Sequence, residues 1–336
     1  MRVFVTGGSG FVGQHVVRRL ATEGHQVLGL ARSGRAAELI SAAGGRPVMG
    51  DLADLAPNGE QAEWTGVLNE CDAVIHGAAR MEFWGPDTGF RRDNYVPTVA
   101  LHVAAAAAGV GRFVLISAAS VSSGSQRAAV VDEGTDNGRP NTAYSRVKLA
   151  TEQAVLSADT PTMSTVVLRP PFIWGAGMTT VTELADLARA GGWTWIDRGR
   201  HVMDFVHVDN LAAAADLALT RGRAAGVYYI TDGRPISIRD FMTPLLATQG
   251  VDVSRAPSVP LWVAAPLGAA LDGGARLLRR PSPPMLTNWL VTFLGHDRSY
   301  DITAARADLG YSPDVDLTQG LAEMISGPVG ADHTSG

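Results

Sequence analysis

Tyr144 and Lys148 are the residues of this sequence best suited, by type and spacing, to do chemistry. They lie in the stretch NTAYSRVKLATEQ, and Lys148 is the only lysine among 28 lysine and arginine residues. Residues four apart project from the same face of a helix, so we expect the phenol and the ammonium to be neighbours. An adjacent ammonium stabilises a phenolate and lowers the pKa of the phenol. The pair therefore predicts proton transfer by Tyr144, supported by Lys148.

A glycine-rich turn near the N-terminus has the spacing of a pyrophosphate-binding loop. The stretch VFVTGGSGFVG places Gly7, Gly10 and Gly13, with Phe11 and Val12 between them, directly after an expected strand and at the start of an expected helix. Glycines there permit a tight turn and close approach of a pyrophosphate, and the helix N-terminus offers N–H donors. A plain turn is the alternative, but the position directly after a strand favours a dinucleotide site.

The end of the second expected strand bears on which dinucleotide is bound. The stretch GLARSGRA contains Arg32 and Ser33, and no acidic residue follows until Glu38. Sites for NAD usually have Asp or Glu here for the ribose 2′-hydroxyl, whereas an arginine accommodates a 2′-phosphate. We therefore expect NADP(H) to be preferred over NAD(H). The alternative is that Arg32 is an ordinary surface charge.

Strands and helical patterns alternate along the chain in the way needed to position these residues. The sequence predicts an α/β fold in which residues 1–175 form a Rossmann-type, doubly wound parallel sheet with helices on both faces. Segment 203–232 is expected to return to this domain. Residues 176–202 and 233–327 are expected to form a smaller substrate-binding lobe, and 328–336 a flexible tail.

Composition and isolated residues exclude several other classes of function. The net charge of −5 offers no basic face to a nucleic acid. Cys71 is alone, so no intrachain disulfide or cysteine metal cluster is expected, and no metal motif is visible. His207, in DFVHVDN, is expected to be structural and to precede a helix capped by Asp209. No signal peptide or transmembrane segment is evident, which favours the cytoplasm.

Several motifs together resemble a known family. TGGSGFVG, HGAA, YSRVK and LRPPFIWGAG resemble the extended short-chain dehydrogenases/reductases, the NAD-dependent epimerase/dehydratase superfamily. YYITDGRPISIRDFM and SYDITAARADLGYSP look like its branch of 3β-hydroxysteroid dehydrogenases, sterol dehydrogenases and 2-alkyl-3-oxoalkanoate reductases. The resemblance implies Tyr144 as acid/base, Lys148 as its partner, and a homodimer. The cofactor contacts that it implies elsewhere are Asp51, Leu52, Ala78, Ala79, Asn94, Pro170 and Pro171.

One position departs from the family pattern. Ala118, in LISAASVSSG, stands where members normally have a Ser or Thr whose hydroxyl polarises the substrate carbonyl. Ser117 is one residue earlier, so strand alternation should turn it to the opposite face. Ser120 has the parity of position 118 and is the expected substitute. A capping or turn-forming role for Ser120 is the alternative.

Apolar residues indicate the character of the substrate. Phe83 and Trp84, in RMEFWGP, are expected at the carboxyl edge of the sheet, where they would form a wall for an apolar substrate; loop packing is the alternative. The stretches 256–271, which contains Trp262, and 281–295 are expected to be helical core of the C-terminal lobe. The alternative is that these stretches form an apolar entrance to the substrate site or contact a membrane surface.

These features predict an NAD(P)(H)-dependent oxidoreductase that interconverts a hydroxyl and a ketone on a bulky lipophilic substrate, of the 3β-hydroxysteroid or long-chain 3-oxo acid type. A nucleotide-sugar epimerase or dehydratase is an alternative, although such enzymes usually have an arginine where Met203 stands. A non-catalytic regulator that senses NADP is another. The retained Tyr144 and Lys148 argue against the regulator, and Ala118 argues for it.

Overall fold

A seven-stranded parallel sheet forms the centre of the molecule. The computed structural model describes residues 1–55, 62–124, 130–278, 280 and 282–326, so the tail predicted over 328–336 lies outside the described residues. The strand order is β12-β7-β5-β4-β1-β2-β3, and every neighbouring pair is parallel. The strands are β1 (Arg2–Thr6), β2 (Gln26–Ala31), β3 (Arg46–Met49), β4 (Ala73–His76), β5 (Arg112–Ile116), β7 (Ser164–Arg169) and β12 (Gly226–Tyr229).

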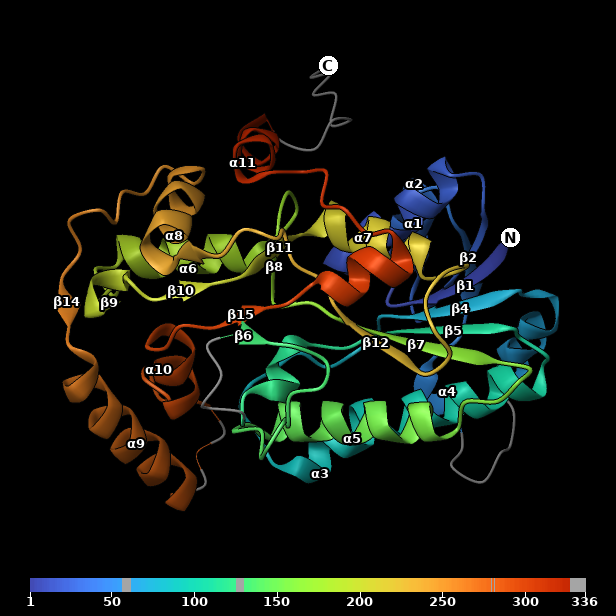
Figure 1. The fold of residues 1–336 in the computed structure, drawn as a ribbon, viewed down its shortest axis with the longest axis horizontal. Helices are drawn as coiled ribbons and strands as arrows, with labels where there is room; N and C mark the ends of the chain where they lie inside the picture. Colours follow the sequence, from blue (N-terminus) through green and yellow to red (C-terminus); the bar gives the residue numbers. More distant parts are fainter. Residues whose placement is uncertain (56–61, 125–129, 279, 281, 327–336) are drawn as a thin grey trace.

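Helices cover both faces of this sheet (Figure 1), because the strands carry apolar side chains on both of their faces. Val3 and Val5 pack into one core, to which α1 (Phe11–Thr22) and α7 (Val208–Leu217) contribute. Phe4, which points to the opposite face, packs into a second core, to which α4 (Val96–Ala107) and α5 (Ala143–Ser157) contribute. Helix α2 (Gly34–Ala42) packs on β2 and β3. The predicted Rossmann-type fold is confirmed.

The direction of winding reverses between β1 and β4. The chain first adds β2 and β3 on one side of β1, and then places β4, β5, β7 and β12 on the other. In an open parallel sheet, ligands bind in the crevice at the carboxyl ends of the strands where the order reverses. The segments that follow Thr6 and His76 therefore border the crevice.

The remaining elements lie beside the main sheet, and many of them pack around a separate apolar core. Trp174, Trp195, Phe205 and Phe241 lie at the centre of this core. Figure 1 shows these elements beside the main sheet, with α9 at the outer edge. They are β8 (Phe172–Trp174), α6 (Thr179–Arg189), β9 (Trp195–Ile196), β10 (Val202–Met203), β11 (Phe205–His207), β13 (Ile236–Ser237), α8 (Ile238–Ala247), β14 (Ser258–Val259), α9 (Leu261–Leu277), α10 (Asn288–Leu294) and α11 (Leu317–Ser326). The remaining short elements are α3 (Asp87–Phe90), β6 (Val130–Val131) and β15 (Ser299–Tyr300).

Helix α9 corrects one expectation. The stretch 256–271 was expected to be lobe core, yet Trp262 is 76% exposed. Helix α9 packs closely on α10 through small residues, and a Cβ added to Gly268 would lie only 2.8 Å from Val291 Cγ2. Its large side chains consequently point outward. Among the described residues, none of the helices combines the length and apolarity needed to span a bilayer.

Candidate active site

The glycine-rich loop after β1 is shaped so that only glycine fits. Gly7 has a φ of +74°, and a Cβ there would lie 2.7 Å from Ala78 N. A Cβ on Gly13 would lie 1.9 Å from the carbonyl oxygen of Gly7, which accepts a hydrogen bond from Gly10 N at 3.0 Å. Gly10 occupies the N-cap of α1 and has no side chain with which to cover the first N–H groups. These donors are thus open to an anion such as a pyrophosphate.

The predicted cofactor residues after β2 and β3 lie at the same sheet edge. Arg32 and Ser33 directly follow β2 and are exposed. The Ser33 hydroxyl accepts a hydrogen bond from Ala36 N at 3.2 Å and so caps the N-terminus of α2. Asp51 and Leu52 follow β3, and Asp51 Oδ1 accepts from Ala53 N at 3.0 Å. The Asp51 side chain thereby fixes the turn after β3.

The loop after β4 is fixed by a buried amide. Asn94 Oδ1 accepts a hydrogen bond from Arg80 N at 2.7 Å, and Asn94 Nδ2 donates to Arg80 O at 3.1 Å. These two bonds fix the end of the loop that contains Ala78 and Ala79, both partly buried. The structure thus brings Ala78, Ala79 and Asn94 to the crevice, although Asn94 acts here through the backbone of Arg80.

Tyr144 and Lys148 lie side by side on the first turns of α5. Both are buried, with exposed fractions of 3% and 4%. Lys148 Nζ donates a hydrogen bond to the carbonyl oxygen of Ile116, the last residue of β5, at 3.0 Å. The rings of Phe83 and Phe90 meet the Tyr144 ring edge-on, with centroids 5.6 and 6.1 Å away. The phenol is therefore held in an aromatic environment next to the end of β5.

Burial sets the protonation of this pair. The expected lowering of the Tyr144 pKa was wrong: burial raises that pKa well above its ordinary value, and the charge of Glu152 raises it further. Burial also lowers the pKa of Lys148 to about 8, against an opposing effect of Glu152. Glu152 is itself paired with Arg169 at 2.6 Å, and both side chains are buried. Near neutrality Tyr144 is therefore a proton donor, and Lys148 is mostly charged.

A chain of hydroxyl groups runs from the N-cap of α5 to the turn after β5. Thr142 Oγ1 donates to Ser145 Oγ at 2.8 Å, and Ser145 Oγ donates to Ser120 Oγ at 3.0 Å. A hydroxyl that accepts one hydrogen bond keeps its own proton for donation elsewhere. Ser120 is partly exposed, so its proton is available to a ligand.

Ala118 and Ser117 occupy opposite sides of the same backbone. Ala118 packs against the apolar cluster around Tyr144 and therefore faces the aromatic environment of the phenol. Ser117 Oγ is buried and has no hydrogen-bond partner among the described residues, which suits a site completed by a ligand. Ala119 N donates to the Pro170 carbonyl at 2.8 Å, which brings Pro170 and the following Pro171 beside this turn.

The aromatic residues predicted for the substrate have different surroundings. Phe83 stacks on Trp289 of α10, with ring centroids 3.8 Å apart, and thus lies between Tyr144 and the C-terminal lobe. Trp84 instead packs at the end of α9. Its Nε1 donates to Arg280 O at 3.1 Å, and the Arg276 guanidinium lies 4.6 Å from its ring centroid.

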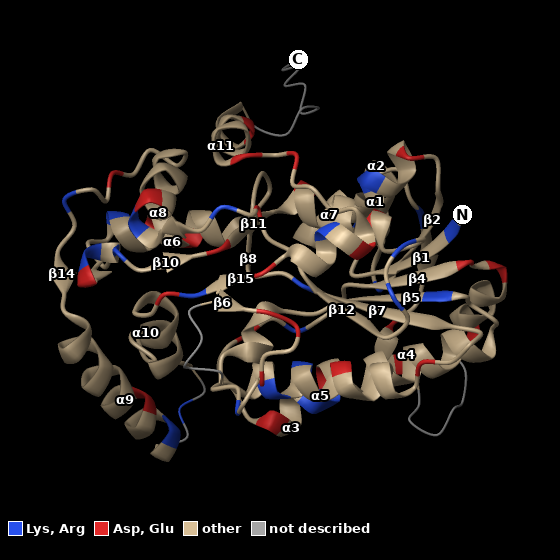
Figure 2. Cartoon of the chain, in the orientation of Figure 1, with Lys and Arg blue, Asp and Glu red and all other residues tan. Residues whose placement is uncertain are grey.

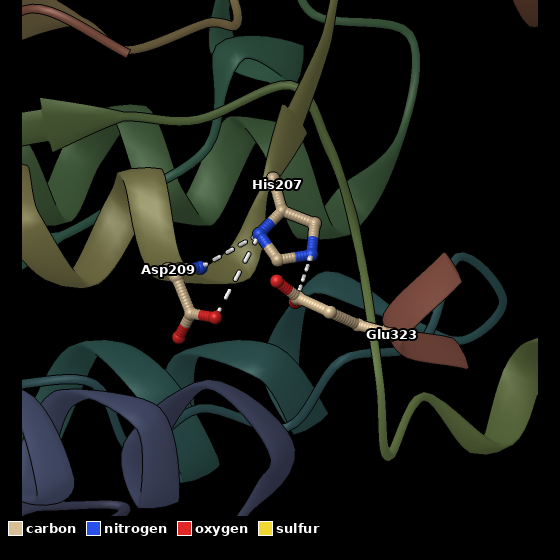
Figure 3. Close-up of side chains that lie close together, drawn as sticks. All are labelled: His207, Asp209 and Glu323. Carbon is tan, nitrogen blue, oxygen red and sulfur yellow. Dashed lines mark hydrogen bonds and ion pairs between the residues drawn. The ribbon is translucent and has the colours of Figure 1, made fainter. Parts of the chain in front are cut away.

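His207, Asp209 and Glu323 form the one group of metal-ligand spacing among the described residues (Figure 3). His207 Nδ1 accepts a hydrogen bond from Asp209 N at 3.3 Å, so the neutral ring keeps its proton on Nε2, 3.9 Å from Glu323 Oε2. Burial lowers the pKa of His207, which favours that neutral form. We interpret the group as a contact that holds α11. The expected helix cap at Asp209 was wrong, because α7 begins at Val208 and His207 is its N-cap.

Comparison with known proteins agrees with this geometry. Residues 3–231 match the model of the NAD dependent epimerase/dehydratase family. The chain belongs to this family. A 4-hydroxy-2-methyl-3-oxo-4-farnesyl-3,4-dihydroquinoline-1-oxide ketoreductase of Stigmatella aurantiaca is 36% identical over 98% of each chain. A 2-alkyl-3-oxoalkanoate reductase of Stenotrophomonas maltophilia is 34% identical over 96% of this chain and 98% of the relative. The solved structure of MoeE5 with UDP-glucuronic acid and NAD has a TM-score of 0.71 and 24% identity, covering 97% of this chain and 98% of that one.

The family member described here is an NAD(P)-dependent oxidoreductase. The predicted resemblance to this superfamily and its dehydrogenase and reductase branch is confirmed. The glycine loop, the open N-terminus of α1 and the orphaned Ser117 hydroxyl fit a dinucleotide in the crevice. Sequence reasoning missed Ser145 and Phe90, and for the stretch 281–295, which contains Trp289, it preferred helical core to an apolar entrance. Only Ser145 had a local signal, since it lies three residues after the N-cap Thr142.

Proposed function

We propose that this protein reduces a ketone to a secondary alcohol on a bulky lipophilic substrate, and catalyses the reverse oxidation. The observation that carries the proposal is the buried pair of Tyr144 and Lys148, enclosed by Phe83 and Phe90 at the carboxyl edge of the sheet. The names of the two reductases reported above describe a farnesylated oxo-quinoline and a 2-alkyl-3-oxoalkanoate, which are both lipophilic oxo compounds. A 3-oxo acid with long alkyl chains or a 3-ketosteroid is therefore the substrate class to test first.

The residues of the chain supply the proton chemistry. The nicotinamide cofactor, when bound, supplies the hydride for the carbonyl carbon. Tyr144 gives its phenolic proton to the carbonyl oxygen, which becomes the hydroxyl of the product. The Lys148 ammonium stabilises the phenolate that is left, and solvent returns the proton. In the oxidation, Tyr144 accepts the proton from the alcohol.

Ser120 is proposed to supply the hydroxyl that the family normally has at position 118. Ala118 faces the cluster around Tyr144 but has no donor to offer. Ser120 lies on the turn directly after it, and the hydrogen bond from Ser145 fixes the orientation of its oxygen. A hydrogen bond from Ser120 to the carbonyl oxygen stabilises the negative charge that develops there. Ser117 is proposed to contact the cofactor side of the crevice, because its oxygen is buried away from Ala118.

NADP(H) is proposed as the preferred cofactor. Arg32 is exposed at the end of β2, and Ser33 begins α2, whose N-terminus faces the same edge. An arginine and a helix N-terminus both favour the additional negative charge of a 2′-phosphate. The residues between Arg32 and Glu38 include no acid that would repel it.

The C-terminal lobe, residues 176–202 and 233–327, is proposed to hold the substrate. Trp289 of α10 connects the lobe to the site by stacking on Phe83, which contacts Tyr144. Phe293 stacks behind Trp289 with a centroid distance of 5.3 Å. These rings form an apolar wall that suits alkyl or steroid carbon better than a nucleotide sugar. Met203, buried in β10, adds no cation for a diphosphate.

Absorbance of the reduced cofactor tests the proposal. Purified wild type, Tyr144→Phe and Tyr228→Phe are each given NADPH or NADH with a 2-alkyl-3-oxoalkanoate, a 3-ketosteroid or a UDP-sugar. Tyr228 is a matched control, because it is a buried tyrosine whose hydroxyl contacts Arg223 N and Asp308 away from the crevice. Oxidation of NADPH by wild type and Tyr228→Phe, lost in Tyr144→Phe, is expected. Conversion of the UDP-sugar without net oxidation would instead establish the epimerase alternative, and cofactor binding without any turnover would favour the regulator.

A further inference from the structure

Apart from Asp272, the residues that helix α9 buries are small, and most of its large apolar residues are exposed. Ala264, Gly268 and Ala275 form the face that packs inward, where a helix of the apolar core would place leucines. The exposed large apolar side chains of α9 and the segment after it are Trp262, Leu267, Leu271, Leu277, Leu278 and Met285. Leu277 and Leu278 are 84% and 70% exposed. An exposed apolar helix face of this kind indicates a site of contact with another protein or with a membrane.

The exposed charged side chains of α9 and of the described segment directly after it are Arg276 and Arg280. The helix contains two charged residues, Asp272 and Arg276. Asp272 is buried, accepts a hydrogen bond from Asn288 N at 3.1 Å, and is paired with Arg276. Figure 2 shows the length of α9 without charge except near its C-terminal end. Arg279 and Arg280 follow directly in the sequence, and Arg280 is exposed.

We propose that the outer face of α9 docks on the surface of an anionic lipid bilayer. A helix that lies in a membrane interface places Trp and Leu at the acyl boundary and arginines among anionic headgroups. Trp262, the leucines, and Arg276 and Arg280 at the C-terminal end of α9 supply these groups, and α9 lies at the outer edge of the molecule (Figure 1). Among the described residues of α9 and of the segment directly after it, a second copy would offer apolar area but no exposed carboxylate for the arginines, so we favour the bilayer.

Docking in this way would bring the membrane next to the wall of the proposed substrate site. Helix α10 packs directly behind α9, and its Trp289 stacks on Phe83, which contacts Tyr144. A lipophilic substrate dissolved in the bilayer would then have a short apolar route to the phenol. This benefit rests on the proposed function, whereas the docking itself rests only on the surface of α9.

Vesicle co-sedimentation tests the docking without cofactor or substrate. The full chain is mixed with vesicles of phosphatidylcholine alone, or of phosphatidylcholine with phosphatidylglycerol. The test variant is Trp262→Glu combined with Leu277→Glu, and the control is Ile325→Glu, at an apolar residue of α11 that is 71% exposed. We expect wild type and control to sediment with the anionic vesicles. The α9 variant is expected to lose at least about tenfold in partition coefficient, because two large apolar side chains no longer enter the interface.

Three results would overturn the proposal. If wild type stays in the supernatant when mixed with anionic vesicles, the protein has no membrane-docking surface. If the α9 variant binds the vesicles as strongly as wild type, the membrane contact lies elsewhere on the protein. A dimer in analytical ultracentrifugation without lipid, dissociated by the α9 substitutions, would assign the face to a second copy. Reduction of a short water-soluble ketone is measured in parallel. Trp262, Leu277 and Ile325 are exposed on the surface of the lobe, whereas Trp289 is the lobe residue that stacks on Phe83. That activity should therefore be equal in all variants, so failure of the docking and failure of the proposed reduction remain distinguishable.

Discussion

Replacing Lys148 with methionine is expected to stabilise the folded protein near neutral pH while it removes catalysis. Burial lowers the pKa of Lys148 from 10.5 to about 8, so the folded state holds its proton less tightly than the unfolded state. At about 1.4 kcal/mol per pKa unit, the buried charge costs about 3 kcal/mol near pH 7. Methionine has a similar length and no charge, so the variant avoids this cost.

The lost hydrogen bond offsets part of the gain. Lys148 Nζ donates to the Ile116 carbonyl at 3.0 Å. Removing a donor from a buried carbonyl costs about 1 to 2 kcal/mol. The free energy of unfolding of Lys148→Met should therefore exceed that of wild type by about 1 to 2 kcal/mol near pH 7.

The difference should disappear as the pH rises. Above the folded pKa of about 8, folded wild type has lost the proton that the unfolded chain still binds, so its stability increases with pH. Between about pH 8 and about pH 9.5 the free energy of unfolding of wild type rises by about 2 kcal/mol, which cancels the greater stability of Lys148→Met. Urea unfolding of both proteins, followed by circular dichroism at several pH values, measures the difference. A stability difference that is constant from about pH 7 to about pH 9.5 would refute the inference that the buried charge of Lys148 destabilises the folded protein.

The same proton should govern the rate of reduction. If charged Lys148 stabilises the Tyr144 phenolate, kcat/KM for ketone reduction falls as the pH rises above about 8. The falling limb reports the free enzyme, so it can be compared directly with the pH at which the stability of wild type begins to rise. A rate that stays level past that pH would separate Lys148 from the proton transfer.

Other substitutions test the remaining parts of the site. Ser120→Ala should lower kcat by about a hundredfold without weakening NADPH binding, whereas Ser157→Ala, at the exposed end of α5, should leave both unchanged. Arg32→Ala should raise the Kd of NADPH about tenfold in a fluorescence titration and leave that of NADH unaltered; equal effects would assign Arg32 to the surface. Glu152→Gln should destabilise the fold by about 3 to 5 kcal/mol in urea unfolding, because it leaves Arg169 buried without a carboxylate.

Features fixed by short stretches of sequence could be predicted. The glycines at 7, 10 and 13 and the four-residue spacing of Tyr144 and Lys148 depend on one turn and one helix, whose geometry local sequence determines. The parallel sheet followed from apolar strands that alternate with helices. Helix boundaries were less certain, as the N-cap at His207, two residues before the predicted Asp209, illustrates.

Features that depend on packing between distant segments could not be predicted. Phe83 and Trp289 are far apart in the sequence, and no local pattern indicates that their rings stack. The outward face of α9 had the composition of a core helix, and only its close packing on α10 through Gly268 determines which side is exposed. The hydrogen bond from Ser145 to Ser120 likewise requires the end of β5 to meet the start of α5.

Because the sequence contains a single lysine, the Lys148 side chain can serve as a spectroscopic probe of the crevice. Protein grown on ¹⁵N-lysine carries one labelled side chain, so a single ammonium resonance reports the crevice and needs no assignment. Lys148, which is 4% exposed, is the only side-chain amine in this sequence that amine-acylating reagents can modify. The rate at which Lys148 reacts therefore measures how often the crevice opens, and a ligand that closes it should slow that reaction.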